Sequence, residues 1–440
     1  MSRTATIPWG AFSEKHKRYI RAALHNRMCV AEGAIRSGKT IDHCIIAAAY
    51  LEKTPDKYHL ASGSTVGNAK LNIGVCNGFG LENLFRGRCR WGKYRDNEAL
   101  YVQTVTGEKI IIFVGGSKSD SYKRILGNSY GLWIATEINE HYDCLDSRMS
   151  FVKVAQGRQI AAARPFTLWD LNPCNPKSPI YEDYIDKFRE NGLAGGYLYE
   201  HFTVMDNATI TAERLEEIKS RYDPNTVWYR RDILGERAIA EGLVYQQFAD
   251  HPELYCVDSL PGQEIRYAVI GVDFGGGTSA HTFCCMGFTT KRALVVLDEW
   301  YERDALDPNT LTQKFVEFVK ACQSRWYVVD CWCDSAEQTL IRGFRVAANV
   351  NRLSLNVGNA MKRPINDRIR ATNMLMQTGR FFVNKTCKHT IEALMNAIWD
   401  SKNPIADVRL DNGTTNIDSL DAMEYTFERE IPNLLEAWGR

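Results

Sequence analysis

Residues 33–40 read Gly-Ala-Ile-Arg-Ser-Gly-Lys-Thr, which is the G-x-x-x-x-G-K-T spacing of a phosphate-binding P-loop. The apolar residues 28–31 precede this stretch and an apolar, helix-compatible run follows at 41–51, so the loop lies between an expected strand and an expected helix. Backbone N–H groups of such a loop, together with the helix N-terminus, attract phosphate oxygens. The agreement of strand, glycines, Lys-Thr pair and helix argues against a chance glycine-rich turn.

The P-loop pattern predicts an ATP site in which individual side chains have separate roles. Lys39 can reach the β- and γ-phosphates, and the Thr40 hydroxyl can hold Mg²⁺. The predicted ATP-binding residues are Gly33, Arg36, Ser37, Gly38, Lys39 and Thr40.

The composition limits the class of protein. A chain of 440 residues is too long for one ordinary hydrophobic core, so two domains are expected. No apolar run approaches the roughly 20 residues of a membrane span, and the N-terminus lacks the layout of a signal peptide. The thirteen cysteines form no C-x-x-C pair, and Cys284, Cys285, Cys331 and Cys333 lie in strand-like runs where buried free thiols are expected. We therefore expect a cytosolic protein without membrane contact.

The charges are unevenly distributed, although the net charge is only +1. Residues 1–130 carry 20 Lys and Arg against 10 Asp and Glu. A basic face on the first domain could bind nucleic acid, or it could be an ordinary solvated surface, and the sequence leaves both alternatives open.

The first part of the chain alternates between helix-like and strand-like segments. A helix is expected at 12–25 with Ser13 as its N-cap, and strands are expected at 58–61, 99–104 and 109–114. Alternation of this kind predicts an α/β fold with a mainly parallel sheet.

A second candidate element is the apolar segment 132–135, which runs into Thr136 and Glu137. A P-loop ATPase needs acids at such a strand end, one to hold Mg²⁺ and the next to polarise the attacking water. Glu137 is the candidate catalytic base, whereas Thr136 leaves a hydroxyl in place of the first carboxylate. The alternative is a buried strand followed by a solvent-facing Glu.

A third element is the strand expected at 166–171, which ends in Asn172 and Pro173. An amide at the carboxyl edge of a sheet could sense the γ-phosphate or its water. Asn-Pro is also a common turn signal, so this residue is a candidate only in combination with the other two elements.

The order of these elements resembles the large subunit of tailed-bacteriophage terminase, the DNA-packaging motor. The resemblance rests on the P-loop with its internal Arg36, on Ile-Leu-Gly at 125–127, and on the strand that ends in Asn-Pro. It continues at 234–245, where the family often has Gly-Glu-Trp-x-x-x-x-Gly-x-x-Tyr and this chain has Arg237 instead of Trp. The resemblance implies a P-loop ATPase domain at 1–201 and a small helical lid at 202–258, followed by a nuclease domain at 259–440.

The segment 259–440 has its own α/β pattern. Pro252, Pro261 and Gly262 indicate a hinge before it. Strands are expected at 266–273, 281–287, 292–300, 326–331, 353–357 and 380–384, and helices at 309–323, 365–377 and 386–399. Three adjacent strands, then a helix and a strand, match a ribonuclease-H-like nuclease.

Three acids fall where that fold would bring them together, namely Asp273 near the end of the first strand, Asp334 beyond the fourth and Asp421 in a final helix. Clustered carboxylates of this kind hold two divalent metals in nucleases. Asp418 lies one helical turn before Asp421 and is a fourth candidate ligand. Each acid alone could be a helix cap or a turn residue. Asp298 and Glu299 also end a strand and could assist, unless Arg303 or a turn simply pairs them.

The terminase family carries Asp-Ala-x-Arg-Tyr at the last of these sites, commonly with a His one turn before the Asp. In this sequence Asp418 replaces that His and Glu424 replaces the Arg. The resemblance therefore implies Asp421 as a metal ligand and Asp418 as an auxiliary one.

Together these features predict a viral motor that hydrolyses ATP to translocate double-stranded DNA into a procapsid and cuts concatemeric DNA with a two-metal endonuclease. Glu137 would activate water and Asn172 would couple phosphate loss to lid movement. Arg36 would stabilise the γ-phosphoryl group in cis, and Arg148 or Arg158 would do so in a neighbouring subunit. Mg²⁺ is the expected metal, and Mn²⁺ should substitute at the nuclease site.

The resemblance also implies partners and a location. The partners are double-stranded DNA, the portal protein of the procapsid, a small terminase subunit and further copies in a pentameric ring, and the location is the host cell cytoplasm during virion assembly. Two alternatives remain open, a nucleic-acid-dependent helicase or remodelling ATPase without nuclease activity, and a structural capsid or portal-binding protein with vestigial sites.

Overall fold

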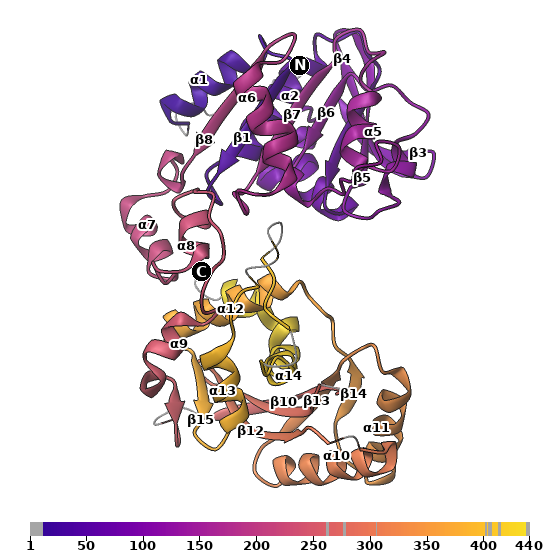
Figure 1. Cartoon of the computed structure of the whole chain (residues 1–440). Coiled ribbons are helices and arrows are strands. Elements are labelled where there is room, and N and C mark those ends of the chain that lie inside the picture. Colours follow the sequence, from indigo (N-terminus) through magenta and orange to yellow (C-terminus); the bar gives the residue numbers. More distant parts are fainter. Residues whose placement is uncertain are drawn as a thin grey trace. The chain divides into compact units, whose positions relative to one another are not determined.

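The computed structural model describes residues 12–260, 264–275, 279–304, 306–400, 403, 407–411 and 415–436. The hinge residues Pro261 and Gly262 lie outside the described residues. The chain divides into two compact units (Figure 1). Unit 1 comprises Met1–Glu217 and Val227–Ile239, and unit 2 comprises Ile218–Thr226 and Ala240–Arg440. The segment 202–258, predicted to be a lid, contributes short helices to both units, and its role stays a prediction.

Unit 1 contains an eight-stranded sheet in the order β3-β4-β5-β2-β6-β7-β1-β8. The strands are β1 (Met28–Gly33), β2 (Tyr58–Gly63), β3 (Cys89–Tyr94), β4 (Asn97–Thr104), β5 (Gly107–Gly115), β6 (Leu132–Ala135), β7 (Phe166–Leu171) and β8 (Tyr197–Phe202). The run from β5 to β8 in this order is parallel, and β3 and β4 add antiparallel strands at one edge. The predicted mainly parallel α/β fold is therefore confirmed.

The helices of unit 1 are α1 (Glu14–Ala23), α2 (Lys39–Leu51), α3 (Val66–Ala69), α4 (Leu81–Leu84), α5 (Phe151–Gly157), α6 (Asp186–Asn191) and α8 (Val227–Asp232), with α7 (Ala212–Lys219) at its boundary. Ser13 is the N-cap residue of α1, as predicted.

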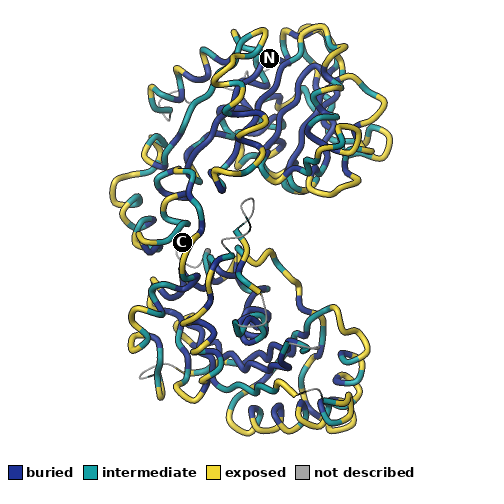
Figure 2. Tube along the Cα trace, in the orientation of Figure 1, coloured by how far each residue is buried: buried dark blue, intermediate teal, exposed yellow. Residues whose placement is uncertain are grey.

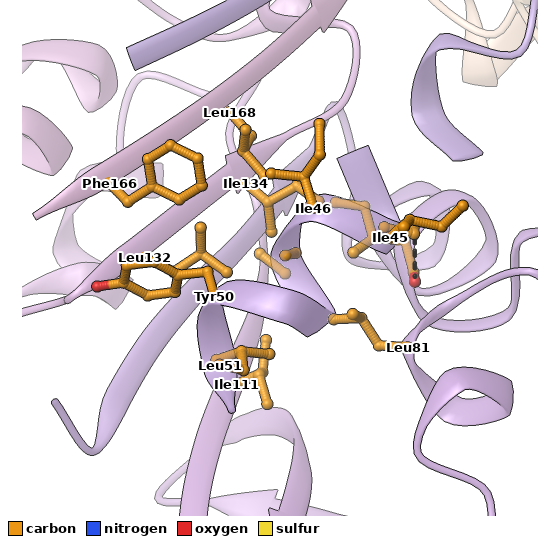
Figure 3. Packing of buried hydrophobic residues seen from close by; sticks show 14 of the residues in the cluster. Ile45, Ile46, Tyr50, Leu51, Leu81, Ile111, Leu132, Ile134, Phe166 and Leu168 are labelled. Carbon is orange, nitrogen blue, oxygen red and sulfur yellow. Dashed lines mark hydrogen bonds between the residues drawn. The ribbon is translucent and has the colours of Figure 1, made fainter. Parts of the chain in front are cut away.

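Strand side chains alternate between two cores, one on each face of this sheet. On β7, Phe166 and Leu168 belong to the core beneath α2, whereas Trp169 and Leu171 belong to the core on the opposite face. Figure 3 shows the α2 core, with Ile45, Ile46, Tyr50 and Leu51 of the helix against the strands. The same alternation assigns position 170 of β7 and position 136 after β6 to the α2 face.

Unit 2 contains a seven-stranded sheet in the order β14-β13-β10-β11-β12-β15-β9. Its strands are β9 (Cys256–Val257), β10 (Ile265–Asp273), β11 (His281–Thr289), β12 (Leu294–Glu302), β13 (Val328–Cys333), β14 (Asn356–Asn359) and β15 (Phe381–Asn384). β10, β11 and β12 are antiparallel, whereas β13 is parallel to β10 and β14 to β13. This arrangement confirms the predicted ribonuclease-H-like topology, extended at one edge by β15 and β9.

The helices of unit 2 are α9 (Gln246–Asp250), α10 (Pro308–Gln323), α11 (Gln338–Val350), α12 (Ile365–Gln377), α13 (Lys388–Asn396), α14 (Asp418–Phe427) and α15 (Ile431–Glu436). α10 and α11 share a core with one face of the sheet. Figure 2 shows that the central strands of each unit are buried, whereas the outer helices of each unit are partly exposed.

No helix among the described residues is long and apolar enough to cross a membrane. All thirteen cysteines lie among the described residues and are free thiols. Cys284, Cys285, Cys331 and Cys333 are buried, as predicted.

The backbone of α14 approaches β10 closely because position 271 is a glycine. A Cβ atom at Gly271 would lie 1.9 Å from the backbone oxygen of Ala422 on α14. This contact is shorter than any real Cβ contact, so a larger residue at 271 must displace the helix. Gly271 therefore helps to fix α14, and with it Asp421, beside the strand that ends at Asp273.

We predict that Gly271→Ala destabilises the packing of α14 by about 1–3 kcal/mol, the usual cost of overpacking. Amide hydrogen exchange in α14 measures this loss locally. Gly343→Ala is the matched control, because a Cβ on that α11 glycine meets its nearest atom only at 3.8 Å. Replacing a helical Gly should instead stabilise by about 0.5–1 kcal/mol. Unchanged exchange in α14 of the Gly271 variant would contradict the close-approach argument.

Candidate functional site

The predicted phosphate-binding loop lies between β1 and α2, at the carboxyl edge of the parallel sheet. Gly38 is the N-cap of α2 with a φ of 97°, a left-handed conformation that glycine adopts without strain. The N–H of Ala34 donates to the carbonyl of Phe202 (2.8 Å) and the N–H of Ile35 to the carbonyl of Asp232 (3.2 Å). The loop is thus held against β8 and α8, with its later residues at the start of a helix.

Lys39 is buried at the centre of this loop. Its Nζ donates to the carbonyl oxygens of Gly33 (2.8 Å) and Ala34 (2.7 Å) and to Oδ1 of Asn172 (3.2 Å). Burial lowers the pKa of Lys39 to about 8, against the opposing attraction of Asp170 and other acids. The structure thus brings the candidate Asn172 to the P-loop lysine.

Glu137 follows β6 at the same edge of the sheet and has a φ of 54°, unusual for a residue with a side chain. Its backbone N–H donates to Oδ1 of Asp170 (3.1 Å), and the Thr136 hydroxyl donates to the same oxygen (3.1 Å). Asp170 is therefore a member of this group that the sequence analysis missed. Its position two residues before Asn172, on the same face of β7, was a signal available in the sequence.

The candidate arginines differ in their surroundings. Arg36 is exposed at the tip of the loop with a φ of 57°, and its carbonyl accepts from Nδ2 of Asn207 (2.7 Å). The Arg148 guanidinium is exposed and pairs with Asp146 (3.2 Å), whereas Arg158 is half-buried at the C-cap of α5. Their cis and trans roles stay predictions.

A pocket opens beside Gly38 at the start of α2. Its lining is partly aromatic and apolar, a character that suits a flat heterocyclic base better than a charged group. The lining residues are Phe12, His16, Ser37, Gly38, Ile41, Phe79, Asn207, Ala208 and Thr209. His16 is fixed by its contact with Asp42 (2.5 Å) and by stacking on the ring of Phe202.

Arg237, which stands where the terminase pattern usually has Trp, is paired with a buried acid next to the P-loop. Its guanidinium donates to both oxygens of Glu32 (2.8–3.1 Å) and to Asp186 (2.7 Å). The hydroxyl groups of Tyr181 (2.7 Å) and Tyr199 (2.8 Å) also donate to Glu32. This network ties the segment after α8 to the last residue before Gly33.

In unit 2 the four candidate acids come together at one end of the sheet. Asp273 ends β10, and the N–H of Asp334, just after β13, donates to the carbonyl of Val272 (2.9 Å). Asp418 and Asp421 occupy the first turn of α14. Burial raises the pKa of Asp273 well above its usual value, and the charges of Asp421, Asp334 and Asp418 raise it further.

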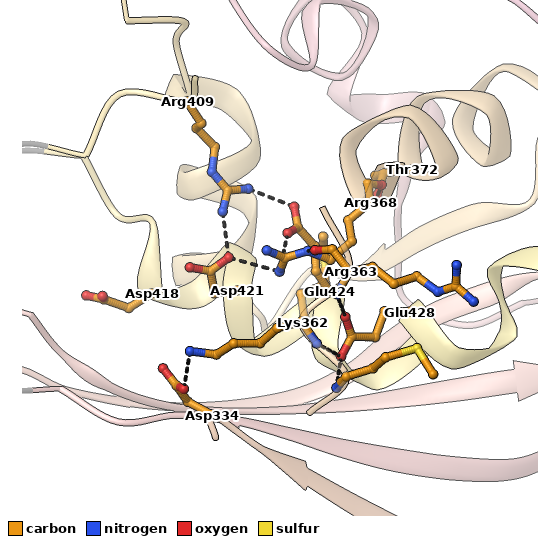
Figure 4. Close-up of polar contacts among 12 residues, drawn as sticks. Asp334, Lys362, Arg363, Arg368, Thr372, Arg409, Asp418, Asp421, Glu424 and Glu428 are labelled. Atoms are coloured by element: carbon orange, nitrogen blue, oxygen red, sulfur yellow. Dashed lines mark hydrogen bonds and ion pairs between the residues drawn. The ribbon is translucent and has the colours of Figure 1, made fainter. Parts of the chain in front are cut away.

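Cationic side chains accompany these acids (Figure 4). Oδ1 of Asp421 accepts from Arg368 (3.1 Å) and Arg409 (2.7 Å), and Nζ of Lys362 pairs with Asp334 (2.5 Å). Arg409 also donates to Glu424 (2.7 Å), the acid that replaces the family's arginine. These three cations were not predicted, because no local pattern in the sequence links them to their partners, which lie 12 to 53 residues away along the chain.

The loop that carries Lys362 is held from behind by a fully buried carboxylate. Glu428 accepts from the backbone N–H groups of Met361 (2.5 Å), Lys362 (3.0 Å) and Arg363 (2.8 Å). Lys362 has a φ of 52° in this loop. Its contact with Asp334 is therefore supported by a fixed backbone.

Among the described residues, no group of three or more His, Cys, Asp or Glu side chains is placed to hold a metal ion. Cations instead contact two of the candidate acids, Asp421 and Asp334. The metal-binding role of Asp273, Asp334, Asp418 and Asp421 stays a prediction.

Neither a scan of protein-family models nor a search of the curated proteins found a match to this chain. Solved structures do match. The large terminase of a thermophilic bacteriophage, in complex with ADP, superposes with a TM-score of 0.77 at 20% sequence identity, over 94% of this chain and 98% of that one. The chain has the fold of a bacteriophage large terminase. The same phage protein in complex with ATP-γ-S gives a TM-score of 0.76 at 18% identity, over 95% and 99% of the two chains.

Within this large-terminase fold, two further acids have structural roles. Asp298 pairs with Arg325, and Glu299 accepts from the backbone N–H groups of His389 (2.7 Å) and Thr390 (2.8 Å) at the start of α13. A carboxylate at a helix N-terminus is stabilising. The assisting role suggested for Asp298 has no support in this geometry.

The buried Lys39 of the terminase fold predicts a pH dependence of phosphate binding. Only the ammonium form attracts phosphate, so affinity for a nucleoside diphosphate should be full only well below pH 8. The affinity should fall as the pH rises through the Lys39 pKa of about 8. Above that pH, each further pH unit should lower the affinity by up to about tenfold. Titration calorimetry between pH 7 and 9.5 measures this.

The control for this pH profile is Lys39→Arg, because a guanidinium stays charged throughout the range. Any binding that this variant retains should be independent of pH. A flat profile for the unaltered chain would contradict the predicted titration of Lys39.

Proposed function

We propose that this chain is a viral DNA-packaging motor that hydrolyses ATP to translocate double-stranded DNA into a procapsid and cuts concatemeric DNA with a metal-dependent endonuclease. The observation that carries the proposal is the presence of two separate sites in one chain. Unit 1 groups Lys39, Glu137 and Asn172 at a P-loop, and unit 2 groups four acids at the end of a ribonuclease-H-like sheet. The large-terminase fold supports this combination, because it spans both units.

ATP would bind along residues 33–40, with its base in the pocket beside Gly38. Lys39 would leave the loop carbonyls and bind phosphate oxygens, and Glu137 would accept a proton from the attacking water. Asn172, already in contact with Lys39, would respond to loss of the γ-phosphate. The Thr40 hydroxyl and the nearby acids offer the oxygen ligands that Mg²⁺ prefers. Bound Mg²⁺ would neutralise phosphate charge.

Developing charge on the γ-phosphoryl group also needs a cation, which an arginine would supply. Arg36 would have to turn inward from its exposed position to act in cis. Arg148 is exposed and available to a neighbouring subunit once it leaves Asp146, which fits a trans role in a pentameric ring better than the half-buried Arg158.

The nuclease site would use Asp273, Asp334 and Asp421, with Asp418 as auxiliary. Carboxylates this close repel one another, as the raised pKa of Asp273 indicates, so the donor set suits divalent cations. Bound metals would activate water and stabilise the leaving oxygen. Lys362, Arg368 and Arg409 would exchange part of their contact with the acids for contact with DNA phosphates.

The remaining partners follow from the proposed motor. They are double-stranded DNA, the portal protein of the procapsid, a small terminase subunit and further copies of the chain, in the host cell cytoplasm during virion assembly. The proposed division is an ATPase domain at 1–201, a lid at 202–258 and a nuclease domain at 259–440.

A second candidate is a nucleic-acid-dependent helicase or remodelling ATPase without nuclease activity. The ion pairs at Asp334 and Asp421 favour it, because they leave the acids without a preformed metal site among the described residues. Cutting of plasmid DNA with added Mg²⁺ distinguishes the two.

For the ATPase site, we predict that Lys39→Ala abolishes ATP hydrolysis while DNA cleavage survives, because Lys39 neutralises phosphate charge and belongs to the other unit. Glu137→Gln should still bind ATP but lose turnover by about 10²–10⁴-fold, since an amide cannot accept the proton. Phosphate release and nucleotide binding are the two measurements. Normal turnover in the Lys39 variant, or loss of binding in the Glu137 variant, would refute these roles.

For the nuclease site, we predict that Asp273→Asn, Asp334→Asn and Asp421→Asn each remove plasmid cleavage while ATP hydrolysis persists. Asp418→Ala should be milder, because the terminase pattern commonly has His there. Mn²⁺ should support cleavage at least as well as Mg²⁺, and Ca²⁺ should bind without turnover.

Glu317→Gln is the matched control, because this exposed acid of α10 pairs with Lys314 and has no predicted part in cleavage. Full cleavage by the Asp273 and Asp334 variants would contradict the nuclease assignment. Unit 2 would then be assigned a DNA-binding or docking role.

A further inference from the structure

Thr136 leaves the proposed ATP site short of one carboxylate. A P-loop ATPase uses an acid at the end of this strand to hold Mg²⁺. The strand β6 ends instead in a threonine, whose hydroxyl is engaged as a donor to Asp170 (3.1 Å). Thr136 thus binds a carboxylate from the neighbouring strand in this structure.

Asp170 lies beside Thr136 on the strand next to the P-loop. In the parallel register of β6 and β7, Ala135 is opposite Trp169, so the next positions along the two strands are Thr136 and Asp170. The order β6-β7-β1 places β7 directly beside the strand that leads into the P-loop. A carboxylate on β7 is therefore one strand closer to the phosphate loop than a carboxylate on β6.

The Asp170 side chain is held on the α2 side of the sheet with one oxygen to spare. Oδ1 accepts from the Thr136 hydroxyl and from the N–H of Glu137. Oδ2 is buried and accepts no hydrogen bond of ordinary geometry from the described residues, although the Thr40 side chain is near enough to lower the carboxyl pKa. Such an oxygen is costly unless a cation or donor joins it.

The neighbouring groups leave that oxygen without a bound cation once Lys39 turns towards the phosphates of a nucleotide. Oδ2 lies 4.0 Å from Nδ1 of His43, one helical turn beyond Thr40, which is beyond hydrogen-bond distance. Lys39 is the cation that lowers the pKa of Asp170 most, and it is the side chain expected to turn towards the phosphates. Its departure leaves a buried carboxylate that requires a new positive charge.

We propose that Asp170 supplies the carboxylate for the Mg²⁺ of bound nucleotide, beside the Thr40 hydroxyl, and that Thr136 is a positioning residue that orients Asp170. This inference rests on the proposed ATP site. It moves the metal-binding acid from the end of β6 to the end of β7, on the strand that also carries Asn172. One strand then presents both the metal ligand and the group that senses the γ-phosphate.

The test is the Mg²⁺ dependence of ADP binding, measured by titration calorimetry with Mg²⁺ and with EDTA. Asp170→Asn keeps the shape and the acceptor for Thr136 but removes the charge. Mg²⁺ should therefore increase the ADP affinity of this variant at least about tenfold less than it increases the affinity of the unaltered chain. Loss of a residue that supports a metal site typically has an effect of this size. Its affinity in EDTA should stay near that of the unaltered chain, which also reports that the variant is folded.

A charge swap separates a ligand from a merely structural acid. Thr136→Asp alone should not strengthen the Mg²⁺ effect, because two adjacent carboxylates repel each other. The double variant Thr136→Asp with Asp170→Asn should recover much of the Mg²⁺ dependence lost in Asp170→Asn. Asp120→Asn, at an exposed acid of the same unit, is the matched control and should change nothing.

Three results would overturn the inference. They are full Mg²⁺ dependence in Asp170→Asn, a stronger Mg²⁺ effect in Thr136→Asp alone, and no recovery in the double variant. Should Asp170→Asn fail to fold, the Thr136→Asp arm still decides. Failure of the unaltered chain to bind ADP at all would instead refute the proposed ATP site, so the two conclusions fail in distinguishable ways.

Discussion

The nucleotide side of this protein depends on one constraint, which is that charges buried at the carboxyl edge of the first sheet must be compensated. Lys39 is buried among loop carbonyls and acids, and Glu32, one residue before the loop, is matched by Arg237. Removing one partner of such a set costs more than the pair contributes, because it leaves an uncompensated charge. The loop geometry is therefore coupled to a segment some 200 residues later in the chain.

Buried charge is also compensated in the second unit, where a buried acid is paired with arginines. Glu424 replaces the arginine of the terminase pattern, and Arg368 and Arg409 arrive from elsewhere to pair with it and with Asp421. The local sequence thus departs from the pattern while the site still contains both guanidinium and carboxylate groups. The loss of an arginine at position 424 is thus compensated by Arg368 and Arg409, which contact the same acids from other parts of the fold.

Much of the fold could be predicted from the sequence, because hydrophobic periodicity reports directly on strands and helices. The helix expected at 365–377 matches α12, and the acids Asp273, Asp334 and Asp421 do lie at neighbouring element ends. Asp170 was missed because its strand reads as an ordinary buried run. Lys362 and Arg409 were missed because no local pattern indicates which distant acid a cation will meet.

The sequence by itself determined the P-loop, the order of the strands along the chain and the identity of the candidate acids, since these follow from local spacing and composition. Only the tertiary structure decided which acid faces Lys39 and Thr40, because that depends on β7 lying between β6 and β1. It also decided that Asp334 and Asp421 are paired with cations. The physical reason is that the energy of a charge depends on burial and on neighbours across the fold, and neither is encoded in adjacent residues.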